Sequence, residues 1–182
     1  IRKRIISQII ATDMANHGEV CSLIKTKIKK YNEKGKEGTI EEKSELILLS
    51  GNEKSKFDEQ QVLLNYLIHC ADLGHNCKKY EICIKWIKLL SEEFWIQGDK
   101  EKSLKISVSF LCDRQKIDVP SSQIGFLKGF IFTTFDSLVE IFPLLNFTMK
   151  NAKRNLDKWQ QLLEEKRKTG WTPKKEKDED NK

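Results

Sequence analysis

The chain has 182 residues, a third of them charged, and it contains no apolar run of about 18 residues or more, which excludes a bilayer-spanning helix of its own. The formal net charge is +6, and much of the positive excess lies between Lys25 and Lys36, where lysines dominate over aromatic residues. Because single-stranded nucleic acids need aromatic rings beside the basic groups, we interpret this stretch as a solvated helix end and loop, and we expect no nucleic-acid partner.

The five cysteines form no C-x-x-C pair and are irregularly spaced, which argues against a disulfide framework and favours a reducing compartment. The first residues, from Ile1 to Ile6, include neither a start methionine nor a signal peptide. We therefore interpret the chain as a fragment of an intracellular protein on the cytosolic side, with tethering to a membrane through upstream segments left open.

The first predicted element covers residues 4–31, where Ile6, Ile10 and Met14 recur at four-residue steps. This period is typical of an amphipathic helix, so we expect one helix, bent or straight. Residues 31–57 are rich in Lys, Glu, Gly, Asn and Ser, which indicates a long polar loop insertion.

A second helix is predicted after Asp58, an acceptable N-cap. Its apolar face is too wide for a surface helix, so we expect it to be buried, and Gly74 should end it. A third helix is expected from about Lys79 to Gln97, ended by Gly98.

A short helix is expected near Asp99 to Ile106, followed by a phenylalanine-rich helix capped by Ser121 or Ser122. Pro143 should bend or stop that helix. The last predicted helix covers roughly residues 148–168, whereas residues 169–182 contain too few apolar side chains to be ordered. With no convincing strand, the chain is predicted to be all-α, with helices crossing around one core.

Asp72 is the first candidate for chemistry, because an ionised carboxylate in a buried helix needs a positive partner such as a divalent cation. His69 and His75 each lie three residues from Asp72 and could share its side of the helix. A helix-end carboxylate paired to a lysine, or capping a backbone amide, explains Asp72 equally well. A metal would also need further ligands from upstream.

Thr12 and Asp13 interrupt an isoleucine-rich helix face, and buried polar groups need partners. They could serve a ligand site. Alternatively, Thr12 bonds to its own helix and Asp13 pairs with a nearby Lys or with His17.

Gln123 and Phe126 lie three residues apart, so the amide and the ring should reach neighbouring parts of one surface. A side-chain amide both donates and accepts, and could pair with a purine edge while the ring stacks on the base. The ordinary alternative is a glutamine near a helix start and a phenylalanine in the core.

Five short motifs in this order resemble the C-terminal half of a class I 3′,5′-cyclic nucleotide phosphodiesterase catalytic domain. The resemblance covers about residues 2–165 and rests on Ala11-Thr12-Asp13-Met14 with His17, His69-Cys70-Ala71-Asp72-Leu73, Glu93-Phe94-Trp95 with Gln97-Gly98-Asp99, Cys112-Asp113, and Ser122-Gln123 with Gly125-Phe126. It implies that residues 1–168 form the C-terminal part of the multi-helix orthogonal bundle, of HD type, that such catalytic domains adopt.

The resemblance also implies hydrolysis of cyclic AMP, cyclic GMP or both to the 5′-monophosphate with two metals, zinc and either magnesium or manganese. Asp72 would be the last protein ligand of the tightly bound metal, and Thr12 would lie in the outer coordination sphere of the second. Two cations neutralise phosphoryl oxygens and acidify bound water, which makes an inert phosphodiester hydrolysable at neutral pH.

The same resemblance assigns the purine pocket. Gln123 would hydrogen-bond the base, Phe126 and Leu90 would clamp it from opposite faces, and Met14 and Leu73 would line the space between base and metals.

The departures from the family pattern are as informative as the matches. The upstream histidine and His-Asp pairs are absent, including the histidine that acts as general acid, so this segment alone should be inactive. His75 stands near the base where the family has asparagine, which leaves the nucleotide preference open. A homodimer is also left open. The alternative function is a catalytically inactive helical interaction or regulatory module.

Overall fold

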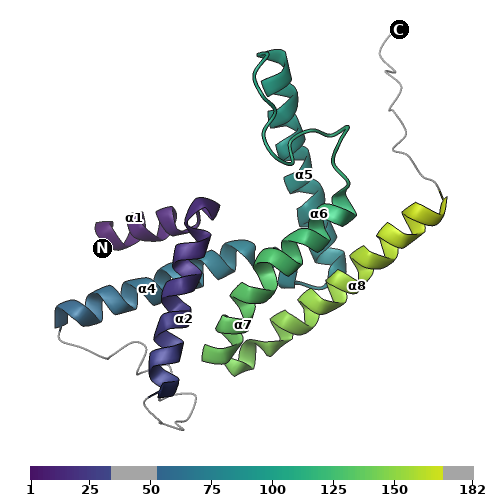
Figure 1. Cartoon of the computed structure of the whole chain (residues 1–182). Helices are drawn as coiled ribbons and strands as arrows, with labels where there is room; N and C mark the ends of the chain where they lie inside the picture. Colours follow the sequence, from purple (N-terminus) through teal and green to yellow (C-terminus); the bar gives the residue numbers. More distant parts are fainter. Residues whose placement is uncertain (34–52, 170–182) are drawn as a thin grey trace.

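A computed structural model describes residues 1–33 and 53–169 of the chain (Figure 1). Every regular element in these residues is helical, without a strand, which confirms the predicted all-α class. Most of the predicted polar loop and nearly all of the predicted disordered tail lie outside the described residues. None of the described helices is long and apolar enough to cross a membrane.

The N-terminal part consists of two helices, not the single one predicted. Helix α1 (Arg2–Ala11) and helix α2 (His17–Glu33) are separated by a 3₁₀ turn, Met14–Asn16. Asp13 adopts an extended conformation, and its carboxylate accepts a 2.9 Å hydrogen bond from the Ala15 amide, which starts the new turn. The N-cap at Asp13 therefore ends the first helix, although the apolar period of the sequence continues past it.

Helix α4 (Glu53–Asp72) runs toward the middle of the molecule and packs against α1, α2 and α7 (Figure 1). It starts before Asp58, so the predicted N-cap lies within the helix. Its buried side chains Leu63, Tyr66 and Cys70 follow the spacing of one helix stripe. They contribute to a core that also contains Leu73 of the following turn and side chains of the other helices: Ile24, Ile28, Ile87, Leu127, Ile131, Phe135, Leu138, Ile141, Ala152 and Trp159.

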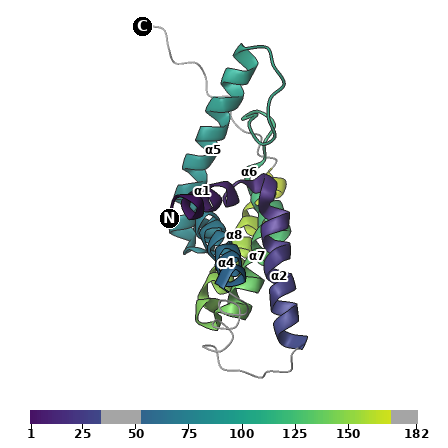
Figure 2. The same ribbon diagram turned by 90° about the vertical axis from the view of Figure 1, so that its left-hand side faces the viewer.

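Helix α5 (Tyr80–Ser103) is longer than predicted and projects away from the core, as Figures 1 and 2 show. Gly98 does not end it, and the short helix expected at Asp99 to Ile106 does not exist as a separate element. A Cβ atom on Gly98 would lie 1.9 Å from the carbonyl oxygen of Cys112. The glycine is thus required for close packing of the following loop, not for helix termination.

Helix α6 (Val119–Phe126) is capped by Asp118, whose carboxylate accepts a 3.1 Å hydrogen bond from the Ser121 amide, so neither predicted serine is the cap. A π-helical turn, Leu127–Ile131, leads into α7 (Phe132–Ile141). The predicted stop at Pro143 is confirmed. Helix α8 (Asn146–Thr169) then packs along α6 and α7, close to its predicted bounds.

Candidate active site

Asp72 is the last residue of α4, and its side chain is exposed, which corrects the expectation of a buried carboxylate. The buried stripe of α4 runs through Tyr66 and Cys70 and continues at Leu73 in the next turn, and Asp72 lies off that stripe. No hydrogen bond or ion pair reaches its carboxylate from the residues that the structure describes, so neither alternative, a lysine partner or a capped amide, is formed there.

The two neighbouring histidines do not join Asp72 in a metal site. His69 is 0% exposed and its Nε2 lies 2.8 Å from Nδ1 of His17. His75 lies in the 3₁₀ turn Leu73–Cys77 after α4, where its Nε2 is 3.0 Å from the Asn76 amide nitrogen. Burial lowers the pKa of His75, although a hydrogen bond with the backbone of Asp72 acts in the opposite direction. The lowered pKa keeps the His75 ring neutral at neutral pH.

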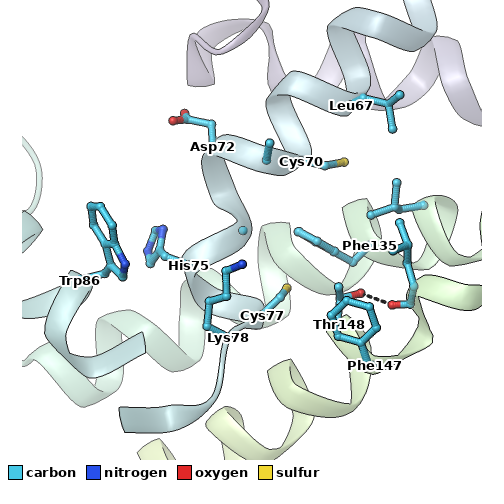
Figure 3. Close-up of a pocket in the computed structure, with 14 residues that line it drawn as sticks. Leu67, Cys70, Asp72, His75, Cys77, Lys78, Trp86, Phe135, Phe147 and Thr148 are labelled. Atoms are coloured by element: carbon cyan, nitrogen blue, oxygen red, sulfur yellow. Dashed lines mark hydrogen bonds between the residues drawn. The ribbon is translucent and has the colours of Figure 1, made fainter. Parts of the chain in front are cut away.

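A pocket of about 580 Å³ lies beside this turn (Figure 3). Asp72, His75 and Trp86 lie at one end of it, and Leu67, Phe135 and Phe147 at the other. The polar side chains near Asp72 thus face a mainly apolar far end, where Thr148 lies beside Phe147. Of the predicted site residues, Asp72 and His75 line it; the remaining six do not.

The described residues contain no group of three or more His, Cys, Asp or Glu side chains that could hold a metal ion. All five cysteines are buried free thiols, as the spacing predicted, and burial raises the pKa of Cys70 to about 12. A metal bound by Asp72 would therefore need its other ligands from outside the described residues.

Thr12 and Asp13 satisfy their polar groups locally. The Thr12 hydroxyl donates a 2.8 Å hydrogen bond to the carbonyl of Ile9, and Asp13 caps the 3₁₀ turn rather than pairing with a lysine or His17. Met14, beside them, is 38% exposed. The isoleucines of α1 are exposed as well, so the polar pair does not interrupt a buried surface in the described chain.

A row of rings connects the predicted purine clamp with helix α4. The centroids of Phe126 and Phe130 are 5.2 Å apart, Phe130 lies 5.1 Å from His17, and His17 lies 5.1 Å from His69. These contacts join α6 and the π-helical turn through α2 to the helix that ends at Asp72. Sequence reasoning found each histidine but not their contact, because 52 residues separate them.

Gln123 lies in α6, and its Oε1 atom is buried without a hydrogen-bond partner among the described residues. A buried amide oxygen without a partner is unusual in folded proteins and is often explained by a ligand or water. Leu90, on α5, is half-buried, whereas Leu73 is buried in the core. The roles of these three residues remain predictions.

Comparison with known proteins identifies the family. A sequence model described as "3'5'-cyclic nucleotide phosphodiesterase" matches residues 1–152. The chain belongs to the 3′,5′-cyclic nucleotide phosphodiesterase family. All eight predicted site residues lie inside the matched stretch.

The relatives within this family include phosphodiesterases named for either nucleotide. The chain is 27% identical over 172 residues (94% of this chain, 24% of the relative) to the probable 3′,5′-cyclic-AMP phosphodiesterase pde-4 of Caenorhabditis elegans. It is 30% identical over 149 residues (82% of this chain, 24% of the relative) to the high affinity cGMP-specific 3′,5′-cyclic phosphodiesterase 9A of Mus musculus. The chain thus spans less than a quarter of the length of these curated relatives.

Solved phosphodiesterase structures share the fold. LmjPDEB1 in complex with IBMX superposes with a TM-score of 0.69 at 25% identity, over 90% of this chain and 43% of that one. The phosphodiesterase domain of Salpingoeca rosetta rhodopsin phosphodiesterase gives a TM-score of 0.69 at 26% identity, over 93% and 46%. These matches confirm the predicted helical architecture of a phosphodiesterase domain.

Proposed function

We propose that the chain is the C-terminal part of a catalytic domain that hydrolyses 3′,5′-cyclic nucleotides to 5′-monophosphates. Membership of the family carries this proposal. The exposed carboxylate of Asp72 at the end of α4, which has no ion pair with any described residue, supports it. Asp72 would bind the tightly held metal, zinc, while Thr12 would lie in the outer coordination sphere of magnesium or manganese. When bound, the metals supply positive charge to the phosphoryl oxygens and acidify water.

The remaining predicted residues would handle the nucleotide. The unpartnered Oε1 of Gln123 would accept a hydrogen bond from the purine, and Phe126 would stack on the base opposite Leu90. Met14 and Leu73 would line the space toward the phosphate. His75, held neutral beside Trp86, would lie near the base.

The nucleotide preference stays open in this proposal. Relatives named for cyclic AMP and for cyclic GMP match the chain at 27% and 30% identity, so similarity does not separate them. A glutamine amide can present either its donor or its acceptor to a purine. A homodimer and membrane tethering through segments outside the chain also remain predictions.

The test is a steady-state assay of the full-length protein with both cyclic nucleotides. We expect Gln123→Ala to raise KM about tenfold or more while bound metal is unchanged, because a buried acceptor for the base is lost. Gln115→Ala, an exposed position in the loop before α6, is the matched control and should leave KM as in the wild type. An unchanged KM for Gln123→Ala would refute the assignment of the purine amide.

The alternative function, a catalytically inactive interaction or regulatory module, is suggested by the lack of a complete metal-binding group in the described residues. It predicts that the full-length protein hydrolyses neither nucleotide at any concentration of divalent metal.

A further inference from the structure

The turn Leu73–Cys77 joins α4 to α5 and places two predicted site residues. Asp72 directly precedes it and His75 lies within it. At its exit Lys78 is extended, with φ −82° and ψ 168°. Because the extended Lys78 ends the helical turn, the last carbonyl groups of the turn receive no hydrogen bond from a following helical turn. Their hydrogen-bond donors must come from another part of the protein or from water.

Helix α8 supplies that partner from more than 70 residues away. Asn155, which is 1% exposed, donates from Nδ2 to the carbonyl oxygens of Asn76 at 2.8 Å and of Lys78 at 2.9 Å. Asn151, one helical turn earlier, donates from Nδ2 to the carbonyl oxygen of Cys77 at 3.1 Å. Three consecutive carbonyls of the turn exit are thus held by two side-chain amides of one helix.

The contact continues from the turn backbone to the pocket. The Asn76 side chain is buried, and its Nδ2 lies 3.3 Å from the carbonyl oxygen of Leu73 and 3.0 Å from Nε2 of His75. With the Asn76 amide as donor, His75 accepts at Nε2, which fixes the orientation of its ring. Asn155 therefore acts through the backbone of Asn76 on the residue that lines the pocket beside Asp72.

Helix α8 also packs along α6, which carries Gln123. The same helix thus contacts both parts of the proposed site, the turn beside the metal ligand and the helix of the purine amide. From these contacts we infer that Asn155, assisted by Asn151, is a positioning residue that holds Asp72 and His75 in place relative to Gln123. The inference rests on the proposed function for the roles of these three residues.

Asn155→Asp is the most informative substitution because it keeps the shape of the side chain and replaces the donating amide by oxygen. A carboxylate oxygen would then face two carbonyl oxygens at hydrogen-bond distance, and the turn should move away. Trp159→Phe is the matched control on the same helix. Trp159 is 2% exposed, and its Nε1 has no hydrogen-bond partner among the described residues, so the change perturbs packing without breaking a bond to the turn.

Two measurements on the full-length protein test the role. The first measurement is hydrogen exchange of the backbone amides of residues 73–79, with the two variants compared at temperatures at which they are equally folded. We expect this exchange to be at least tenfold faster in Asn155→Asp than in Trp159→Phe. Zinc titration after chelation, followed by elemental analysis, should show about 10- to 100-fold weaker binding in Asn155→Asp and wild-type binding in Trp159→Phe.

Equal exchange rates in the two variants, or zinc affinity that falls equally in both, would overturn the positioning role. Asn151→Ala should give a smaller effect in the same direction, because it removes one bond at a half-buried position. If the wild-type protein neither binds zinc nor hydrolyses cyclic nucleotide, the proposed function fails. The exchange rates of residues 73–79 then still decide whether Asn155 holds the turn.

Discussion

Gly98→Ala tests the close approach between α5 and the loop that follows it. The new Cβ atom would lie 1.9 Å from the Cys112 carbonyl oxygen and 2.6 Å from its carbonyl carbon, both backbone atoms. No rotamer change can relieve this clash, so the loop must retreat by more than 1 Å to bring the shortest distance beyond 3.0 Å. Alanine favours an exposed helix over glycine by about 1 kcal/mol, whereas overpacking costs about 1–3 kcal/mol.

We therefore expect Gly98→Ala to lower the free energy of unfolding by about 1 kcal/mol and to loosen the loop at residues 104–117. The ion pairs across this loop, Lys102 with Asp113 and Arg114 with Asp99, are partly exposed and should contribute too little to hold it. Thermal unfolding and the rate of tryptic cleavage after Lys116 measure both effects.

Gly125→Ala is the control for Gly98→Ala, because nothing lies within 4 Å of a Cβ atom at this exposed position in α6. It should stabilise the protein by up to about 1 kcal/mol. If Gly98→Ala gave the same stabilisation and unchanged cleavage, the packing argument for Gly98 would be wrong.

Two further predictions concern the buried polar contacts of the core. Burial, with contributions from His69 and Lys25, lowers the pKa of His17, so below about pH 6.5 the unfolded chain binds a proton that the folded chain resists. The contribution of His17 to the free energy of unfolding should be constant above about pH 7.5 and should fall on acidification by up to about 1.4 kcal/mol per pH unit. Urea unfolding at pH 5–8 should show a weaker pH dependence in His17→Gln. An unchanged slope in this variant would contradict the prediction. The Tyr66 side chain is 0% exposed, and its hydroxyl donates a hydrogen bond to the Thr134 carbonyl oxygen. Tyr66→Phe should therefore lower the free energy of unfolding, measured in urea, by about 1–3 kcal/mol. A change below about 0.5 kcal/mol would show that the bond contributes little.

The sequence predicts the helices well wherever an apolar period sets them. Helix α8 and the stop at Pro143 follow from periodicity and proline chemistry. The errors lie where a contact distant in sequence, or a local cap, overrides the period. Asp13 breaks the first helix although the isoleucine period continues, and the opposing Cys112 backbone explains Gly98 better than helix termination does.

The candidate site is less accessible to sequence reasoning than the helices. A wide apolar face on this helix suggested that Asp72 is buried, but the buried stripe is narrower and leaves the carboxylate exposed. The spacing of His69 from Asp72 suggested a shared ligand face, whereas the structure pairs His69 with His17 from another helix. Pairings across 50 to 80 residues, such as this one and that of Asn155 with the turn, leave no periodic signal.

The most direct test of the account is Asp72→Ala in the full-length protein, with Asp157→Ala, an exposed position on α8, as control. Bound zinc and the rate of hydrolysis of cyclic AMP and cyclic GMP are measured together on folded protein. We predict that Asp72→Ala loses the bound zinc and at least about 100-fold in turnover, since a carboxylate ligand is removed, while Asp157→Ala keeps both. Hydrolysis by Asp72→Ala at the wild-type rate would contradict the assignment of this carboxylate and the site built around it.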